Sequence, residues 1–288
     1  MLALGDYFQY NSRYAVHFFR GRRTVRTSKE AFSLHILITN DDGIHSTGIK
    51  ALADAAIRRG HKVTVTGPSK QCSANSQHIT LTKPLLVHEI PWEGARAYSL
   101  EGTPTDCVRV APFIAEQKFD YCLSGINNGE NAGSAVYYSG TVAAAREAAM
   151  CYIPSMAVSI MPGADETMRE HLADLAVRMA EHFREIELPR FGFINLNAPA
   201  IAPEEIKGLK LCPLSRAYYL DGYEKRVSPL GQTYFWLTAG DTSEIPMEQP
   251  EEGSDYYWLR RGYMTCTFLG EFTDFNLECG NLLEEFRA

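Results

Sequence analysis

The segment Leu34-His35-Ile36-Leu37-Ile38-Thr39-Asn40-Asp41-Asp42-Gly43 decides the fold class of this chain. Its first six residues form a short run rich in β-forming side chains, too brief for a helix. The four residues that follow are typical of a turn. We therefore predict a strand over 34–39 that ends at two adjacent aspartates.

The residues beyond this turn predict a helix and then a second strand. Apolar side chains recur at helical spacing from Ile49 to Ile57, and Gly60 is a suitable helix stop. The run Lys62-Val63-Thr64-Val65-Thr66 is β-rich and is followed by Gly67-Pro68. Because a helical crossover joins parallel strands, these two strands are expected to be parallel neighbours in a doubly wound sheet.

The same alternation of strands and helices continues to about residue 203. Further strands are predicted at 98–100, 120–124, 155–160 and 192–196, and further helices at about 103–115, from Ser139 to before Pro154, and at 168–183. Thr103-Pro104-Thr105-Asp106 resembles a capping box with proline in the first turn. The fold class predicted is α/β, Rossmann-like and doubly wound, with a mostly parallel sheet.

The C-terminal third has a different pattern. Tyr234-Phe235-Trp236-Leu237 and Tyr256-Tyr257-Trp258-Leu259 are aromatic, strand-like runs separated by an acidic stretch with proline and glycine. This pattern predicts a β-hairpin or arm. Exposed aromatic side chains of this kind usually need a partner, whereas packing on the chain's own core explains them equally well.

Composition excludes several classes of protein. Of the 288 residues, 45% are hydrophobic and 22% are charged, which is typical of a chain that folds. The seven cysteines include no CxxC pair, so neither a disulfide framework nor a zinc cluster is indicated, and a reducing, cytoplasmic location is expected. The net charge of −7 argues against long nucleic acid as a partner, and no apolar run is long enough to span a membrane.

The first 33 residues have a character of their own. They hold six basic and two acidic residues, a net charge of +4, against −11 for the remainder. We expect residues 1–33 to be an extension that is disordered or serves in targeting. A mitochondrial transit peptide, a start codon assigned too early and a solvated tail are equally compatible with this composition.

Polar side chains follow three of the predicted strands, at the point where each strand ends. They are Asn40, Asp41 and Asp42 after the first, Ser73, Asn75 and Ser76 after the second, and Asn127, Asn128 and Asn131 after the strand at 120–124. Because ligands of an open parallel sheet bind outside the carboxyl ends of its strands, these groups are expected to converge. Two adjacent carboxylates repel each other in a desolvated crevice unless a cation offsets them, and oxygen ligands suit Mg²⁺, Mn²⁺ or Ca²⁺. A simple turn that caps the next helix is the alternative.

Ser139-Gly140-Thr141 opens an alanine-rich helix whose first N–H groups lack intrahelical partners. Such a helix end can hold an anion, although a plain Ser or Thr cap explains the segment equally well. A phosphate held there, beside a metal at Asp41 and Asp42, would place phosphorus next to metal-bound water. The combination favours a phosphate-ester hydrolase.

Five segments in this order resemble the SurE family, the stationary-phase survival proteins, which are divalent-metal-dependent 5′-nucleotidases. They are Ile38-Thr39-Asn40-Asp41-Asp42-Gly43-Ile44, residues 73–81, Gly102-Thr103-Pro104-Thr105-Asp106-Cys107, residues 124–133, and Tyr138-Ser139-Gly140-Thr141-Val142-Ala143-Ala144-Ala145. The resemblance covers residues 34–160. It implies hydrolysis of nucleoside monophosphates to nucleoside and phosphate, with 3′-nucleotides and short polyphosphate as further substrates of some members.

The resemblance also implies the site and the assembly. One Mg²⁺ or Mn²⁺ per subunit would be bound by Asp41, Asp42, Ser73 and Asn127. As a separate hypothesis, which rests on the residues themselves, Asp41 or Asp42 accepts a proton in catalysis, while Ser139, Gly140 and Thr141 hold the phosphate with help from Asn131. A homodimer or homotetramer would form through C-terminal elements. The chain is accordingly divided into the extension 1–33, a Rossmann-like phosphatase core 34–203, and an arm with a terminal helix for oligomerisation, 204–288.

The chain departs from the family pattern mainly in that arm. Ser228-Pro229-Leu230-Gly231 stands where a Pro-Arg-Gly turn is usual, and Thr267-Phe268-Leu269 replaces an expected Thr-Pro-Leu. These departures concern oligomer geometry rather than the metal ligands. A catalytically silent nucleotide-binding regulatory module is the alternative function.

Overall fold

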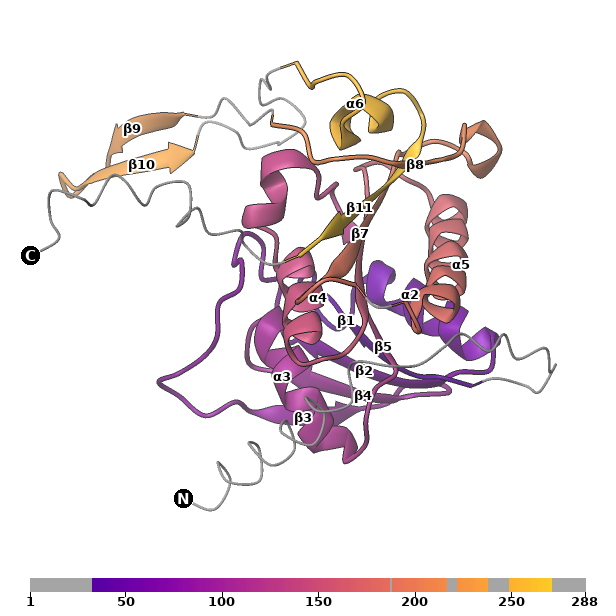
Figure 1. Ribbon diagram of the computed structural model, residues 1–288. Coiled ribbons are helices and arrows are strands. Elements are labelled where there is room, and N and C mark those ends of the chain that lie inside the picture. The colour runs from indigo at the N-terminus through magenta and orange to yellow at the C-terminus, as the bar shows by residue number, and fades with distance from the viewer. Residues whose placement is uncertain (1–32, 187, 217–221, 238–248, 271–288) are drawn as a thin grey trace, which may run out of the picture. The chain divides into compact units, whose positions relative to one another are not determined.

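The computed structural model describes residues 33–270, apart from 187, 217–221 and 238–248. Its main feature is a nine-stranded sheet with the order β3-β4-β2-β1-β5-β6-β7-β11-β8 (Figure 1). The strands are β1 (His35–Thr39), β2 (Lys62–Pro68), β3 (Val87–Ile90), β4 (Arg96–Leu100), β5 (Tyr121–Asn128), β6 (Ser155–Ile160), β7 (Phe193–Ala198), β8 (Leu209–Leu211) and β11 (Met264–Leu269).

The helices lie on both sides of this sheet. They are α2 (Thr47–Arg58), α3 (Pro104–Ala115), α4 (Gly140–Met150), α5 (Glu166–Phe183) and the short α6 (Asp255–Leu259), with 3₁₀ turns η1 (Gly133–Tyr137) and η2 (Pro203–Glu205). None of the helices in the described residues is long and apolar enough to cross a membrane.

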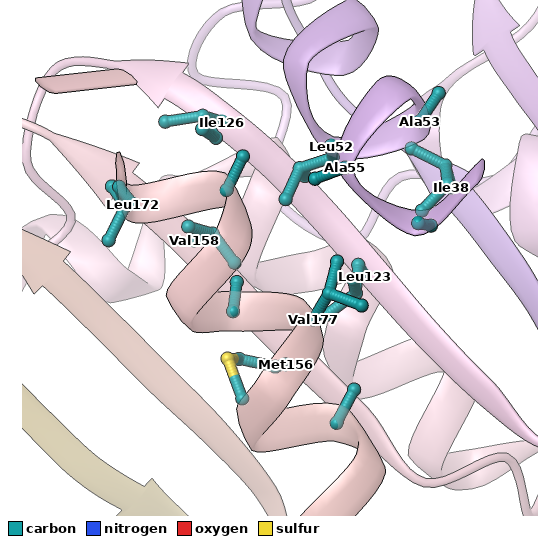
Figure 2. Packing of buried hydrophobic residues seen from close by; sticks show 14 of the residues in the cluster. Ile38, Leu52, Ala53, Ala55, Leu123, Ile126, Met156, Val158, Leu172 and Val177 are labelled. Atoms are coloured by element: carbon teal, nitrogen blue, oxygen red, sulfur yellow. The ribbon is translucent and has the colours of Figure 1, made fainter. Parts of the chain in front are cut away.

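The central strand β1 is buried along its whole length, and its side chains alternate between two cores. Ile36 and Ile38 pack with α2 and α5 on one face. Figure 2 shows this layer, in which Ile38 and Leu123 from the sheet lie near α2 and α5. Leu37 faces the opposite way and packs with α3 and α4. Burial on both faces explains why the strand is a nearly continuous apolar run.

The sheet is parallel from β4 to β7 and changes direction at its margins. β3 is antiparallel to β4, and β11 is antiparallel to β7. Because β1 pairs with β2 on one side and with β5 on the other, the strand order reverses at β1. The carboxyl ends of β1 and β5 therefore form the topological switch point, where such sheets bind ligands.

The structure confirms the predicted α/β, Rossmann-like, mostly parallel fold. Ser46, Thr103, Ser139 and Asp165 are the N-caps of α2 to α5, and Thr103 and Asp106 form the capping box expected for α3. The sheet extends beyond β7, the last of its strands that the sequence predicted, through β11 and β8. The edge strand β3 was not predicted, since it is short and mostly exposed.

The C-terminal prediction needs a second correction. Tyr234–Leu237 does form a strand, β10 (Thr233–Leu237), but it pairs with β9 (Tyr223–Val227) in a separate hairpin. The run 256–259 is wrong as a strand, because it lies in α6. Tyr256 and Leu259, three residues apart, pack against Ala132, so tertiary contacts override aromatic β-propensity. The predicted terminal helix and the extension before Ser33 lie outside the described residues.

Candidate metal and phosphate site

The turn after β1 is held by its asparagine and by the cap of α2. The Asn40 side-chain amide donates to the Gly43 carbonyl at 2.9 Å and to the Ser46 hydroxyl at 2.7 Å. Ser46 in turn accepts from the backbone of Ile49. The alternative explanation of the motif, a cap for the next helix, therefore describes Asn40 and Ser46 but not the two aspartates.

Asp41 caps a different helix, α4, which begins 99 residues later in the sequence. Its carboxylate accepts a hydrogen bond of 3.0 Å from the Thr141 amide and a second from the Thr141 hydroxyl. The side chain is only 5% exposed. A Cβ atom on Gly140 would lie 2.8 Å from the Asp41 Cβ, so glycine is needed for this close approach. The first strand and the predicted anion-binding helix end thus meet at Asp41.

Asp42 is partly buried and lies between two other segments of the site. Its carboxylate accepts from the backbone amide of Asn128, at the end of β5, at 3.1 Å. The Gln71 side chain, just after β2, donates to it at 3.3 Å. Asp42 therefore joins the carboxyl ends of β1, β2 and β5.

The electrostatics of this pair favour a bound cation. Burial, and to a smaller extent the charge of Asp42, raise the pKa of Asp41 to about 6, against hydrogen bonds from Thr141 that lower it. Burial also raises the pKa of Asp42 above its usual range, against hydrogen bonds from Asn128 and Gln71. No described basic side chain is among the groups that shift either pKa. A divalent ion would supply the missing positive charge.

The remaining predicted ligands are placed near this pair by the backbone. The Cys72 amide donates to the Asp41 carbonyl at 2.7 Å, which brings the adjacent, exposed Ser73 to the aspartates. The Asn127 side-chain amide donates to the Gly129 carbonyl at 2.6 Å, so its carbonyl oxygen remains available as a ligand. The two aspartates, Ser73 and Asn127 would all bind a metal through oxygen atoms, and this ligand set fits Mg²⁺ or Mn²⁺.

No group of three His, Cys, Asp or Glu side chains gathers around a possible metal position within the described residues.

The helix N-terminus is partly occupied by the protein itself. Ser139 is the N-cap and accepts from the Val142 amide at 3.1 Å. Both donors of Thr141 point to Asp41. The Gly140 amide donates to no described residue, and the Ser139 hydroxyl proton is not needed for the cap. Phosphate binding by Ser139, Gly140 and Thr141 stays a prediction, in which Gly140 and Ser139 have donors to spare.

Asn131 lies in a buried polar network behind the site. Its side-chain amide donates to the Ser159 hydroxyl at 2.8 Å, and its backbone amide donates to Asn197 at 2.8 Å. The side chains of Asn195 and Asn197 both donate to the Asn131 carbonyl. This network anchors the loop after β5 on β6 and β7, and the predicted contact of Asn131 with substrate remains untested.

Several contacts that support the site were not predicted from the sequence, including those that Asp106 makes outside its capping box. Asn195 and Asn197 alternate within the buried strand β7, where polar side chains need partners, and this pattern could have identified them. Asp106 accepts from the Thr80 amide and hydroxyl at 3.0 and 2.7 Å, and Glu147 accepts from Gln77 at 2.8 Å. These contacts hold the irregular segment 69–86, which carries Ser73, against α3 and α4.

The fold and the site define an α/β protein whose sheet carries a ligand site at its switch point. Residues 36–221 match the family model described as "Survival protein SurE". The chain belongs to the SurE family. It is 38% identical over 243 residues to the "5′-nucleotidase SurE" of Nitratidesulfovibrio vulgaris strain DP4, covering 84% of this chain and 95% of that protein.

Two further comparisons agree. The "5′-nucleotidase SurE" of Thermosipho africanus is 37% identical over 241 residues, which are 83% of this chain and 92% of the relative. The crystal structure of the SurE protein from Aquifex aeolicus superposes with a TM-score of 0.71 at 31% identity, over 88% of this chain and all of that one.

Proposed function

We propose that this protein is a phosphoric monoester hydrolase of the 5′-nucleotidase type, which converts nucleoside monophosphates to nucleosides and inorganic phosphate. The relatives that it matches along most of its length are named for this activity. The observation that carries the proposal is the position of Asp41, a buried carboxylate that touches the N-terminus of α4 and neighbours a second carboxylate. This arrangement brings a cation site and an anion site together.

The chemistry follows from the residues around the switch point. Asp41, Asp42, Ser73 and Asn127 would hold one Mg²⁺ or Mn²⁺ ion per subunit. When bound, this ion lowers the pKa of a coordinated water molecule and offsets negative charge on the phosphoryl group.

The chain's own residues supply the rest of the mechanism. Asp41 or Asp42 accepts the proton that the attacking water loses. The Gly140 amide and the Ser139 hydroxyl orient the phosphate oxygens at the positive end of α4, where Thr141 holds Asp41 in place, and Asn131 assists.

Release of inorganic phosphate from a panel of 5′- and 3′-nucleoside monophosphates and short polyphosphate tests the proposal. We expect turnover with Mg²⁺ or Mn²⁺, none with chelator, and a loss of at least about a hundredfold in kcat/KM for Asp41→Asn and Asp42→Asn. Tight nucleotide binding without phosphate release would instead support the regulatory module. Near-normal turnover in both variants would contradict the assignment of the aspartates.

Assembly and location complete the proposal. Every residue of the strands β9 and β10 is exposed, including Tyr223, Phe235 and Trp236 at 70%, 58% and 60%. A second copy of the chain that covers these side chains would give a homodimer or homotetramer. The described cysteines are all free thiols, which supports a reducing compartment and hence the cytoplasm.

A further inference from the structure

Asp255, the first residue of α6, is a fully buried carboxylate. Its oxygens accept three hydrogen bonds of 2.8 Å, all from backbone amides, those of Gly133, Ser215 and Tyr256. Burial raises the pKa of Asp255, against these hydrogen bonds, and no described basic side chain is among the groups that shift it. Burial of a carboxylate that has only backbone partners lowers the stability of the fold, so the presence of Asp255 needs an explanation.

Gly133 is the partner that connects Asp255 with the site. It begins η1, and the backbone continues through hydrogen-bonded turns in which the Tyr138 and Ser139 amides both donate to Ala135. Ser139 is the cap of α4, and the next residue, Gly140, packs against Asp41. A shift of Gly133 would therefore move the groups at the start of α4.

The contacts around Gly133 leave little room for such a shift. A Cβ atom there would lie 3.1 Å from the Ser215 carbonyl oxygen and 3.1 Å from the Tyr256 ring. Ala132 packs in one cluster with Tyr256 and Leu259. On the other side, Asn131 is held by the asparagines of β7. The loop is thus held at two places: at Asn131 by β7, and at Gly133 by the residues around Asp255. Asp255 is the charged group at the second place.

We propose that Asp255 is a positioning residue for the phosphate subsite: through Gly133 and η1 it holds the loop that places Ser139 and Gly140 at the N-terminus of α4. The inference rests on the proposed function, because it assigns that loop to substrate phosphate. It makes α6, which lies outside the segment matched by the family model, a part of the site's scaffold.

The test compares Asp255→Asn with Glu181→Gln. The asparagine keeps the volume of Asp255 but turns an NH₂ group toward amide donors, so at least one hydrogen bond is lost. Glu181 is a matched control, because its carboxylate also makes three hydrogen bonds, with Arg59 twice and with His61. It lies at the opposite, amino-terminal edge of the sheet, where α2 ends and β2 begins.

We expect Asp255→Asn to raise KM for a nucleoside monophosphate and the inhibition constant of inorganic phosphate together, by about tenfold. The kcat should change less, because the loop contacts phosphate in ground and transition states alike. Hydrogen exchange in peptides covering residues 129–141 should become faster. Glu181→Gln should lower the melting temperature without any of these changes.

The proposal fails if Asp255→Asn loses stability as the control does while KM, phosphate inhibition and exchange at 129–141 stay at wild-type values. Should this variant not fold, Gly133→Ala alters the same contact between η1 and α6. An unchanged KM in that variant would equally overturn the proposal. If wild-type protein releases no phosphate from nucleotides, the proposed function fails. The exchange comparison still decides whether Asp255 holds the loop.

Discussion

Asp41 shows how a single residue can serve both a helix and a proposed catalytic site. Its carboxylate caps α4 through Thr141 and lies beside the second carboxylate, Asp42. An N-terminal helix cap stabilises the negative form of such a side chain, whereas burial destabilises it. Burial dominates here, because the pKa of Asp41 is raised to about 6.

This raised pKa predicts how metal binding depends on pH. Without metal, the folded protein holds the Asp41 proton more tightly than the unfolded chain, so stability falls as pH rises from about 4 to about 6. The penalty, on the order of 3 kcal/mol, is complete above that window. A bound cation removes it. The rise in melting temperature on adding Mn²⁺ should therefore be larger at about pH 7.5 than at about pH 5.

Asp41→Asn is the control for that measurement. The amide has no charge to offset, so Mn²⁺ should stabilise the variant little at either pH, and the metal-free variant should lose the decline in stability between about pH 4 and 6. Equal stabilisation of the wild type at both pH values would contradict this account of the carboxylate pair.

Gly140 lies too close to Asp41 to accommodate a larger side chain. Because its Cβ would lie 2.8 Å from the Asp41 Cβ, Gly140→Ala must displace Asp41 or the start of α4. We expect a loss of about 1–3 kcal/mol in stability and of at least about tenfold in kcat/KM. Gly60→Ala is the comparison within the chain, since a Cβ there contacts nothing within 4 Å, although its φ of +84° adds strain. Full activity of Gly140→Ala would show that the close approach is unnecessary.

At the scale of elements, local signals predicted most of the core. The apolar run of β1, the capping box of α3 and the helix α5 are each determined by residues close together in the sequence, and the structure confirms them. The aromatic run at 256–259 was mistaken for a strand because its helix depends on contacts with Ala132, which is distant in sequence. Asp255 and Glu147 were missed for the same reason, since their partners come from other elements.

The aspartate pair was predictable because its two members are adjacent in sequence and follow a buried strand. That Asp41 would cap α4 was not, because the contact joins residues 100 positions apart. Nor did the sequence indicate that the donors of Thr141 are used within the protein. Placement of Ser73 depends on the irregular segment 69–86, which has no periodic pattern.

The N-caps of α4 and α5 offer a prediction at this scale. Ser139 accepts from Val142 at 3.1 Å and Asp165 accepts from Met168 at 2.8 Å. Ser139→Ala and Asp165→Ala should each cost about 1 kcal/mol of unfolding free energy, measured by denaturant titration. Of the two, Ser139→Ala alone should raise KM for the nucleotide, by about three- to tenfold. A similar KM in both variants would remove Ser139 from the phosphate subsite.

At the scale of the whole molecule, the exposed hairpin predicts assembly. Phe235→Ser combined with Trp236→Ser should lower the mass measured by light scattering and leave the circular dichroism spectrum unchanged, because both side chains are exposed in one chain. Phe113→Ser is the control, since Phe113 is an exposed aromatic on α3, 67% accessible. An unchanged mass in the hairpin variant, or a wild type that is monomeric, would contradict the assembly role.

The central claim concerns the edge of the sheet where β1, β5 and α4 meet: two neighbouring carboxylates, one buried and one partly buried, persist there because a divalent ion lies between them. Crystals soaked in manganese, with anomalous diffraction data collected near the manganese absorption edge, test this most directly. We predict an anomalous peak within about 2.0–2.3 Å of oxygen atoms of Asp41 and Asp42. A map with no peak there, and with both side chains turned away from each other, would contradict the account.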